Sequence, residues 1–552
     1  MEMSTNANAL RELEEELHTE LVPGTEVMTD TAKHHFIHGT HNDTVLVPQP
    51  TSNPHDPLNW SRLWKFSANT CATLITLTQT LGPLAISPIV ETLAEDFKCS
   101  VNDIILCQGI TIIVLGFSNF LWVPISQVFG RRIALLASLL ITLASHVWRA
   151  KSTNFQSFFG AAALAGVGTS PSETLQPTIV ADTIFLHERG FYNTLYFAGF
   201  FINLMLGPIL QGAMAQSVGW QSFWWLNVAL TAFVIVLSCV GLPETLWHRS
   251  GPDELNDSIP QSNDSSPSHA DDAFGKHVTK EQTVALERIG EREEGEHHNC
   301  VGVGAPSARQ FWLAQRPAQP VKALALAFWT PWYLITFPIV VFASCVICFC
   351  SANYLILTLI QAEAFSKSPY NFTPLNIGFV NFASLIGALI GLATAGPASD
   401  WVSMQLTKRN NGVREPEMRL PTMIPYVFIM LLGNFVCAFG LQHGWDWRAI
   451  TVIGFGCAGI QIASLPAIAA TYAVDSYKPV ASSIFICATI FKNLWGYGVS
   501  KFITSWVASK GYVGPFMLNM CLAFLSCSAA LIFWYWGKKL RRMSAKSFVH
   551  RQ

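Results

Sequence analysis

Residues Ile104 to Ile125 read IILCQGITIIVLGFSNFLWVPI, an apolar run without a single charged side chain. An α-helix needs about 20 residues to cross the ~30 Å hydrocarbon core of a bilayer, so this run is long enough to span it. A short basic connector, Gly130-Arg131-Arg132, follows the run. The stretch therefore predicts a membrane-spanning helix and a turn into water after it.

The rest of the chain repeats this pattern of long apolar runs and short polar connectors. Of its 552 residues, 51% are hydrophobic and 13% are charged, whereas soluble domains are about 25% charged. Twelve such runs can be counted, and the predicted fold is an all-α membrane protein with twelve transmembrane helices. The runs cover approximately 64–90, 104–125, 133–150, 156–181, 191–216, 221–242, 331–360, 375–397, 420–441, 449–474, 480–507 and 513–537.

The first six runs and the last six look like copies of each other. Gly166 and Asp182 are sixteen residues apart in the fourth run, and Gly459 and Asp475 are sixteen apart in the tenth. The connector after the second run is echoed after the eighth by Gly396-Pro397-Ala398-Ser399-Asp400. Matches in corresponding positions indicate two pseudo-symmetric six-helix bundles with a binding site between them near the midplane.

The polar segments divide the chain into five parts. We predict a largely disordered cytosolic tail over 1–63, bundles over 64–243 and 329–537, a cytosolic central loop over 244–328 and a basic cytosolic tail over 538–552. The loop is rich in Ser, Asp, Glu and His, so its first part is expected to be disordered. Its apolar last stretch can lie along the membrane surface as an interfacial helix.

The distribution of Lys and Arg predicts the orientation. With residues 1–61 and the central loop left out, sixteen lie in the connectors and the C-terminal tail on the side of the termini and six lie on the other side. Positive charge concentrates on the cytosolic side of membrane proteins, so both termini are predicted to be cytosolic. We expect a plasma-membrane protein, with a vacuolar or other endomembrane location as the alternative. Asn371-Phe372-Thr373 is then an external glycosylation acceptor.

Several classes of function lack support in the sequence. There is no basic patch of the kind that binds nucleic acid and no Gly-rich phosphate loop. The cluster Cys345, Cys348 and Cys350 lies in an apolar run with no His or carboxylate beside it, so these thiols are read as packed side chains. We therefore predict no metal, no cofactor and no enzymatic activity, and energy would have to come from an ion gradient.

Two charged residues, Glu173 and Lys492, lie deep within apolar runs. A charge inside a bilayer is costly, so it tends to face a protein-lined cavity and to mark a transport path. A buried carboxyl group takes up a proton more readily than an exposed one, so Glu173 could couple proton flow or bind a cationic substrate. Lys492 could pair with a carboxylate, bind an anionic substrate or support helix contacts. Four uncharged polar residues in the runs are further candidates for the site: Gln79, Asn203, Asn353 and Gln461.

Several motifs resemble the Major Facilitator Superfamily, and within it the fungal drug:proton-antiporter-like group. The connector Val123 to Arg132 is similar to the superfamily's loop signature, although its acidic position is Gln127. Leu186-His187-Glu188-Arg189-Gly190 looks like the branch of histidinol and polyamine permeases, and Asp56-Pro57-Leu58-Asn59-Trp60 also occurs there. Gly207, Pro208 and Gly212 are similar to the antiporter motif, with the second Gly one residue late.

The resemblance implies a gating latch and a cavity lined by the first, fourth, seventh and tenth helices. In the latch, arginines at the inner helix ends pair with acids, and the pairs break and re-form as the halves rock. Ordinary positive-inside residues would explain the arginines alone. The latch residues implied are Gly130, Arg131, Arg132, Asp182, Asp400 and Asp475.

We predict a monomeric secondary transporter that works by alternating access and exports a small organic molecule, such as a secondary metabolite, drug or toxin, in exchange for protons. One alternative is proton-coupled uptake of an organic cation such as a polyamine or histidinol. Another is a transporter-like receptor that signals without transporting.

Overall fold

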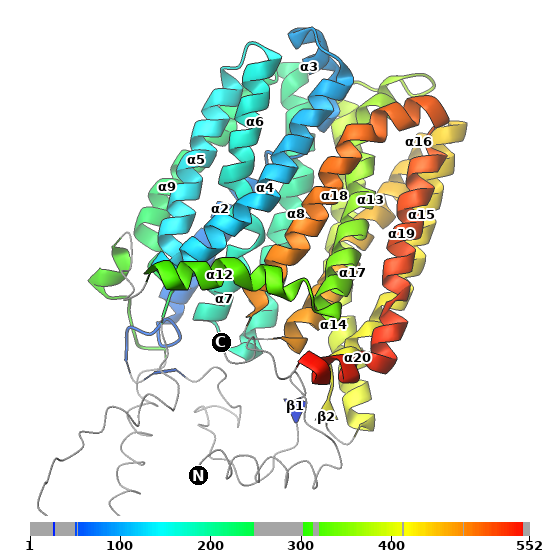
Figure 1. Ribbon diagram of the computed structural model, residues 1–552. Helices are drawn as coiled ribbons and strands as arrows, with labels where there is room; N and C mark the ends of the chain where they lie inside the picture. Colours follow the sequence, from blue (N-terminus) through cyan, green and yellow to red (C-terminus); the bar gives the residue numbers. More distant parts are fainter. Residues whose placement is uncertain are drawn as a thin grey trace, which may run out of the picture.

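The computed structural model describes residues 26–27, 50–51, 53–247, 302–312, 320–410, 413–477 and 480–544. Figure 1 shows long, roughly parallel helices gathered into one bundle. One end carries α7, α20 and a short strand pair, and we call it the terminal face. The other end carries α3 and α16, and we call it the opposite face. The strands are β1 (Glu26–Val27) and β2 (Val413–Arg414), which pair in antiparallel fashion.

Each half of the chain contributes six spans, and several spans are built from more than one helix. The N-terminal half contains α2 (Arg62–Thr80), η1 (Ser87–Ile89), α3 (Val90–Phe97), α4 (Val101–Phe129), α5 (Arg131–Ala150), α6 (Phe155–Thr169), η2 (Ser170–Glu173), α7 (Leu175–Thr183), α8 (Leu186–Ser217) and α9 (Gln221–Gly241). The segment between the halves contains η3 (Ala308–Phe311) and α12 (Pro320–Leu334). The C-terminal half contains α13 (Pro338–Ser366), α14 (Pro374–Arg409), η4 (Pro416–Thr422), α15 (Met423–His443), α16 (Trp447–Ala449), η5 (Ile450–Phe455), α17 (Gly456–Ser476), α18 (Ala481–Lys510), α19 (Val513–Ser528) and α20 (Ala530–Ser544).

The predicted all-α architecture of twelve spans in two bundles is confirmed. Within the described residues, nine helices are long and apolar enough to cross a membrane. The other three spans are α2, the broken segment α6–η2–α7, and α18. Each of these three carries a polar residue that lines the central cavity, namely Gln79, Glu173 and Lys492. These three spans therefore each contribute a polar group to the cavity that other, more apolar spans also line.

The repeated Gly and Asp positions occupy equivalent places in the two halves. A side chain at Gly166 would meet the backbone of α4, and one at Gly459 would meet the backbone of α14. Both glycines thus let the fourth span of their half pack closely on the second. These contacts explain the spacing as a packing requirement that each half repeats.

The two halves meet along two seams, where α4 packs on α18 and α8 packs on α14. Glycines make the contacts close. An added Cβ at Gly212 of α8 would lie 2.5 Å from the carbonyl oxygen of Pro374, and one at Gly116 of α4 would lie 2.8 Å from Cβ of Asn493. Gly212 therefore has a packing role at the seam, because small residues let two helices approach closely.

The motif at 56–60 forms a compact turn on the terminal face. Asp56 accepts hydrogen bonds from the backbone of Thr51 and Leu58, at 3.0 Å each. Trp60 is fully buried and pairs with Gly304 in a single parallel bridge. The end of the N-terminal tail and the segment 302–312 are thus fastened to each other.

The helix boundaries differ from the prediction in several places. The seventh span is α13, which begins at Pro338 after a break, and not a run starting at 331. The fourth span is interrupted by the 3₁₀ turn η2, which contains Pro171, and α8 already begins at Leu186. Residues Glu244 to Leu246, expected at the start of a disordered loop, are buried against the N-terminal half. Residues 248–301 and most of the predicted disordered tail lie outside the described residues.

We expect Gly212→Leu to lower the melting temperature of the purified protein. The new side chain would collide with the Pro374 carbonyl group and force α8 away from α14, and overpacking of this kind typically costs about 1–3 kcal/mol. The matched control is Gly396→Leu, also a glycine of a seam-forming helix, where an added Cβ meets nothing within 4 Å. Equal melting temperatures for the two variants would contradict the close contact.

Candidate functional site

A salt bridge between the halves lies at the centre of the site. Nζ of Lys492, on α18, donates a hydrogen bond to Oε1 of Glu173, on η2, at 2.5 Å. The side chains are 23% and 12% exposed, respectively, so both charges are largely removed from water. Of the ion pairs whose two partners both lie among the described residues, this one alone joins the two halves. Each charge thus offsets the cost of burying the other.

The break in the fourth span places Glu173. The 3₁₀ turn η2 interrupts the helix before Leu175, so Glu173 does not follow the rotation of a continuous helix. The hydroxyl of Tyr196 on α8 donates to the carbonyl oxygen of Ser172 at 2.6 Å, and Thr174 donates to Oδ1 of Asn119 on α4 at 2.7 Å. The residues on both sides of Glu173 are therefore anchored, which fixes the carboxylate in place.

A cavity of about 200 Å³ lies beside the ion pair. Its wall is mostly aliphatic and aromatic, and Glu173 and Lys492 are its charged lining residues. Helix α8 contributes the largest aromatic group: Tyr196, Phe197, Phe200 and Phe201. An apolar pocket with a few polar groups is typical of a binding site for a small organic molecule.

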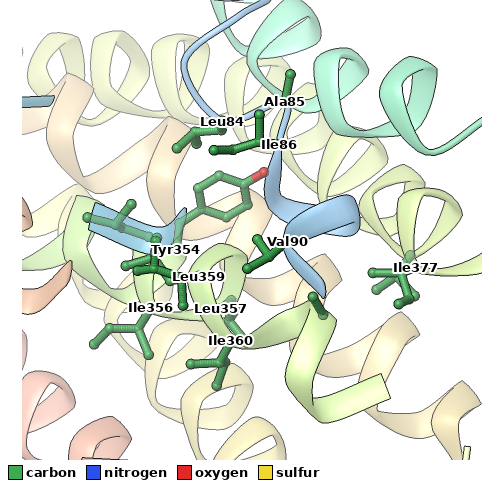
Figure 2. Packing of buried hydrophobic residues seen from close by; sticks show 14 of the residues in the cluster. Leu84, Ala85, Ile86, Val90, Tyr354, Ile356, Leu357, Leu359, Ile360 and Ile377 are labelled. Atoms are coloured by element: carbon green, nitrogen blue, oxygen red, sulfur yellow. The ribbon is translucent and has the colours of Figure 1, made fainter. Parts of the chain in front are cut away.

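The cavity ends toward the opposite face in a hydrophobic plug. Figure 2 shows Leu84 and Ile86, from the segment between α2 and α3, and Val90, the first residue of α3, beside Tyr354 and Leu357 of α13. These side chains are all at least nine-tenths buried. Leu84 and Tyr354 also line the cavity, so the plug forms its end wall. In the other direction the lining reaches Ala470 and Phe485, close to the helix ends at the terminal face.

Hydrogen bonds between the halves reinforce the plug. Nε2 of Gln361 donates to the hydroxyl oxygen of Ser87 at 2.6 Å across the interface. Within the C-terminal half, Nδ2 of Asn381 donates to Oε1 of the same Gln361 at 3.1 Å and so holds it in position. Nearer the opposite face, the hydroxyl of Ser366 donates to the carboxylate of Glu91 at 2.7 Å. This end of the interface is therefore closed by both apolar and polar contacts.

The uncharged candidates divide into one that lines the cavity and three that do not. Gln79 is in the lining, and its Nε2 donates to the hydroxyl oxygen of Ser138 at 3.0 Å. Asn203 donates to a carbonyl of its own helix, at Gly199. Asn353 accepts a hydrogen bond from Asn519, and Gln461 donates to the Cys350 carbonyl oxygen at 2.8 Å. Asn203, Asn353 and Gln461 are absent from the cavity lining, and the last two connect helices within the C-terminal half.

The predicted latch residues of the N-terminal half form one cluster. Nε of Arg131 donates to Oδ2 of Asp182 at 3.1 Å. The backbone N–H groups of Arg131 and Arg132 donate to the two oxygens of Glu244, at 2.8 and 3.0 Å. The Arg132 guanidinium instead donates to backbone carbonyls at the end of α9. Gly130 has φ of +118°, and a side chain there would collide with Glu244, so glycine is required at this turn.

An equivalent cluster lies in the C-terminal half, with Arg419 as its centre. Nε of Arg419 donates to Asp475 at 2.8 Å, and NH1 donates to Asp400 at 2.7 Å. Beside it, the fully buried Arg541 binds Glu417 and Glu415. Burial alone would raise the pKa of the Glu415 carboxyl group, but the guanidinium of Arg541 outweighs it and holds that pKa below its usual value.

Every latch pair described here joins residues of the same half. The contacts thus tie the second, third and fourth spans of the N-terminal half together, and likewise the eighth, ninth and tenth spans of the other. A role in which these pairs break during rocking stays a prediction. The remaining predicted positions are Gly207, which packs on the Leu81 backbone, Pro208, near Gly378 of α14, and Asn371, which is exposed in the loop before α14.

Sequence reasoning missed several residues of the site. The aromatic side chains of α8 were not expected to line the cavity, because the resemblance assigned that role to other helices. The cluster of aromatic residues between Phe191 and Phe201 was a signal for them. Glu244 and Arg419 were read as connector residues, although Pro243-Glu244-Thr245 directly follows an apolar run.

Among the described residues, no group of three or more His, Cys, Asp or Glu side chains is arranged to hold a metal ion. Two thiols approach each other in the C-terminal half: Sγ of Cys350 on α13 and Sγ of Cys527 on α19 lie 3.9 Å apart. Both thiols are buried, so they pack as small apolar side chains.

We expect Tyr196→Phe to destabilise the fold around the site while the aromatic ring still lines the cavity. The substitution keeps the aromatic ring and removes the hydrogen bond to the Ser172 carbonyl, which leaves a buried acceptor unpaired at a cost of about 1–2 kcal/mol. The melting temperature should therefore fall. Tyr535→Phe, at a side chain that is 78% exposed, is the matched control and should leave it unchanged. A fall of the same size in both variants would argue against the anchoring role of Tyr196.

Comparison with known proteins agrees with this geometry. The sequence model of the Major Facilitator Superfamily matches residues 71–490. The chain is 24% identical to the uncharacterized MFS-type transporter C1271.10c of Schizosaccharomyces pombe, over 97% of this chain and 95% of that protein. It is 22% identical to protein HOL1 of Saccharomyces cerevisiae, over 92% of each chain.

Among solved structures, the fold is similar to the xylose transporter XylE from E. coli in a partially occluded inward-open conformation. The TM-score is 0.56 at 15% identity, covering 86% of this chain and 99% of that one. Since the superfamily match extends over most of the sequence and the fold agrees with it, the chain belongs to the Major Facilitator Superfamily and is a multi-pass membrane transporter.

Proposed function

We propose that this transporter exports a small organic compound in exchange for protons, by alternating access between its two halves. The observation that supports this is the salt bridge from Glu173 to Lys492, which joins the halves beside an apolar cavity. A proton on Glu173 would remove one of the two charges, and a charged ligand group could replace either partner. Proton binding and substrate binding would both therefore act on the contact that holds the halves together.

Lys492 is the main partner of the Glu173 carboxylate. The second oxygen of Glu173, Oε2, is buried and has no hydrogen-bond partner among the described residues. The contact with Lys492 is therefore the one that a proton or a charged ligand group would disturb. Asn493 of α18, which is also in the cavity lining, has an unpartnered buried Nδ2 as well.

The second candidate is proton-coupled uptake of an organic cation. The aromatic side chains of α8 next to Glu173 favour it, because aromatic faces and a carboxylate both attract positive charge. The two candidates share the same residues and differ in the direction of transport. We further propose that the protein is a monomer in the plasma membrane and that the terminal face is cytosolic. The plug then closes the external side and the cavity serves the cytosol.

We expect Glu173→Gln to abolish proton-dependent transport. The amide cannot carry a negative charge, so it can neither exchange a proton nor pair ionically with Lys492. The measurement compares metabolite concentrations inside and outside cells of three strains, which carry the wild-type gene, the variant or a deletion of the gene. An exported compound should accumulate inside both mutant strains, whereas a compound that is taken up should be depleted in both.

The control for this experiment is Glu363→Gln. Glu363 is a carboxylate on α13 that pairs with Lys367 outside the cavity, so its loss should leave transport unchanged. Transport that keeps its rate and pH dependence in Glu173→Gln would remove Glu173 from the mechanism. Signalling that persists in this variant while transport is lost would favour the receptor alternative.

The orientation has a separate test at Asn371. This residue is exposed, and the loop that carries it lies before α14, on the opposite face. If that face is external, the protein should lose mass when N-glycans are removed enzymatically, and Asn371→Gln should abolish the shift. A mass shift that survives in the variant would assign the glycan to another position and so contradict the prediction.

A further inference from the structure

The two charges that line the cavity cancel each other. Among the described residues of the wall, Glu173 and Lys492 are the charged ones, and they come from different halves. A ligand that binds between the halves must leave this pair intact or take the place of one or both partners. The charge of the ligand decides which of these happens, so the pair restricts the class of substrate.

A ligand without charge gives the pair no reason to separate. Nζ of Lys492 and Oε1 of Glu173 are 2.5 Å apart, and a hydrogen bond between two charged groups is stronger than one to a neutral group. A ligand shifts a conformational equilibrium only by as much as its affinity differs between the two states. A neutral ligand would therefore bind beside the pair and leave the contact between the halves as it is.

A ligand with a single charge leaves one partner alone. An organic cation would bind Glu173 and leave the ammonium group of Lys492 unpaired, next to a second positive charge. An organic anion would bind Lys492 and leave the carboxylate of Glu173 unpaired unless a proton binds there at the same time. Joint binding of a proton and an anion would give co-transport, which is the opposite of the exchange proposed above. The rest of the wall is mostly aliphatic and aromatic, so an unpaired charge there is costly.

A zwitterion replaces both partners at once. Its ammonium group can bind Glu173 and its acidic group can bind Lys492, so that no charge is left without a partner. A proton on Glu173 would remove the first of these contacts, and protons and substrate would therefore compete, as exchange requires. Because the two side chains touch in the structure, the two charges of the ligand must lie close together.

The apolar wall indicates what the rest of the ligand is. Phe197 and Phe200 of α8 line it from one half, and Tyr354 and Leu355 of α13 line it from the other. The cavity of about 200 Å³ is smaller than the roughly 300–1,000 Å³ that is usual for drug-sized ligands. It is therefore suited to a compact molecule with one aromatic or branched aliphatic group.

We propose that the substrate is a compact zwitterion with an apolar body, whose ammonium group pairs with Glu173 and whose acidic group pairs with Lys492. This inference rests on the proposed exchange of substrate for protons and adds the charge of the substrate to it. The bound zwitterion would connect the two halves in place of the salt bridge, so the halves are released from each other without the burial of a lone charge.

The test compares four probes that share an indole ring. Tryptophan carries both charges, tryptamine only the ammonium group, indole-3-propionate only the carboxylate, and tryptophol neither. Their dissociation constants for the purified full-length protein are measured by isothermal titration calorimetry at neutral pH. We expect tryptophan to bind at least tenfold more tightly than each of the others, because each of them lacks at least one hydrogen bond to a charged group. Equal or tighter binding of any other probe, or no binding of tryptophan, would overturn the proposal.

Variants of the pair show which charge each residue recognises. Glu173→Gln should weaken the binding of tryptophan and tryptamine but not of indole-3-propionate, whereas Lys492→Gln should weaken tryptophan and indole-3-propionate but not tryptamine. Each single variant leaves a lone charge that can prevent folding. The double variant has no lone charge and should bind all four probes with similar affinity, while the control Glu363→Gln keeps the wild-type order. A double variant that still prefers tryptophan tenfold would show that the pair does not recognise the charges.

The substrate class and the proton exchange can fail separately. A preference for tryptamine, together with proton-dependent transport that is lost in Glu173→Gln, would overturn the substrate class alone. A preference for tryptophan that disappears in the double variant, together with unaltered pH dependence of transport in Glu173→Gln, would overturn the exchange and support the substrate class.

Discussion

Glu173 and Lys492 share one hydrogen bond inside an apolar bundle. This pair constrains how the helices around it can pack. Neither Glu173 nor Lys492 is stable there alone, because the surroundings offer little to replace hydration. Their pairing requires η2 and α18 to face each other, which in turn requires the second and eleventh spans to approach along a glycine-lined seam. The charge pair and the close helix packing therefore depend on each other.

The interface between the halves is closed by two kinds of contact, and they respond to different conditions. The plug of Leu84, Ile86, Val90 and Leu357 is apolar, so its strength hardly changes with ligand charge or pH. The salt bridge deeper in the molecule is made by two charged groups, so a charged ligand group could compete for either one. In a transporter built in this way, the salt bridge can respond to the ligand while the apolar plug keeps the opposite face closed.

Much of the architecture could be predicted from hydropathy and internal repeats, since long apolar runs and the Gly–Asp spacing depend on local sequence. The pairing of Glu173 with Lys492 could not. Both residues were expected to face a cavity, and a carboxylate was one of the partners considered for Lys492, but the particular pair depends on the 3₁₀ turn at Pro171 and on the approach of two spans from different halves. The same holds for the aromatic wall of α8 and for Glu244, because each acquires its role from a partner more than one span away.

The segment 302–312 is attached to the N-terminal half, and this attachment decides which part of the long insert connects the two halves. The backbone N–H of Glu244 donates to the carbonyl oxygen of Gln310 at 2.8 Å, so the beginning and the end of the insert meet on the N-terminal half. The path from this attached segment to the C-terminal half then runs through α12, whatever the length of chain between the two points that meet. Evolution can therefore lengthen, shorten or rewrite the intervening residues without altering the mechanical link between the halves.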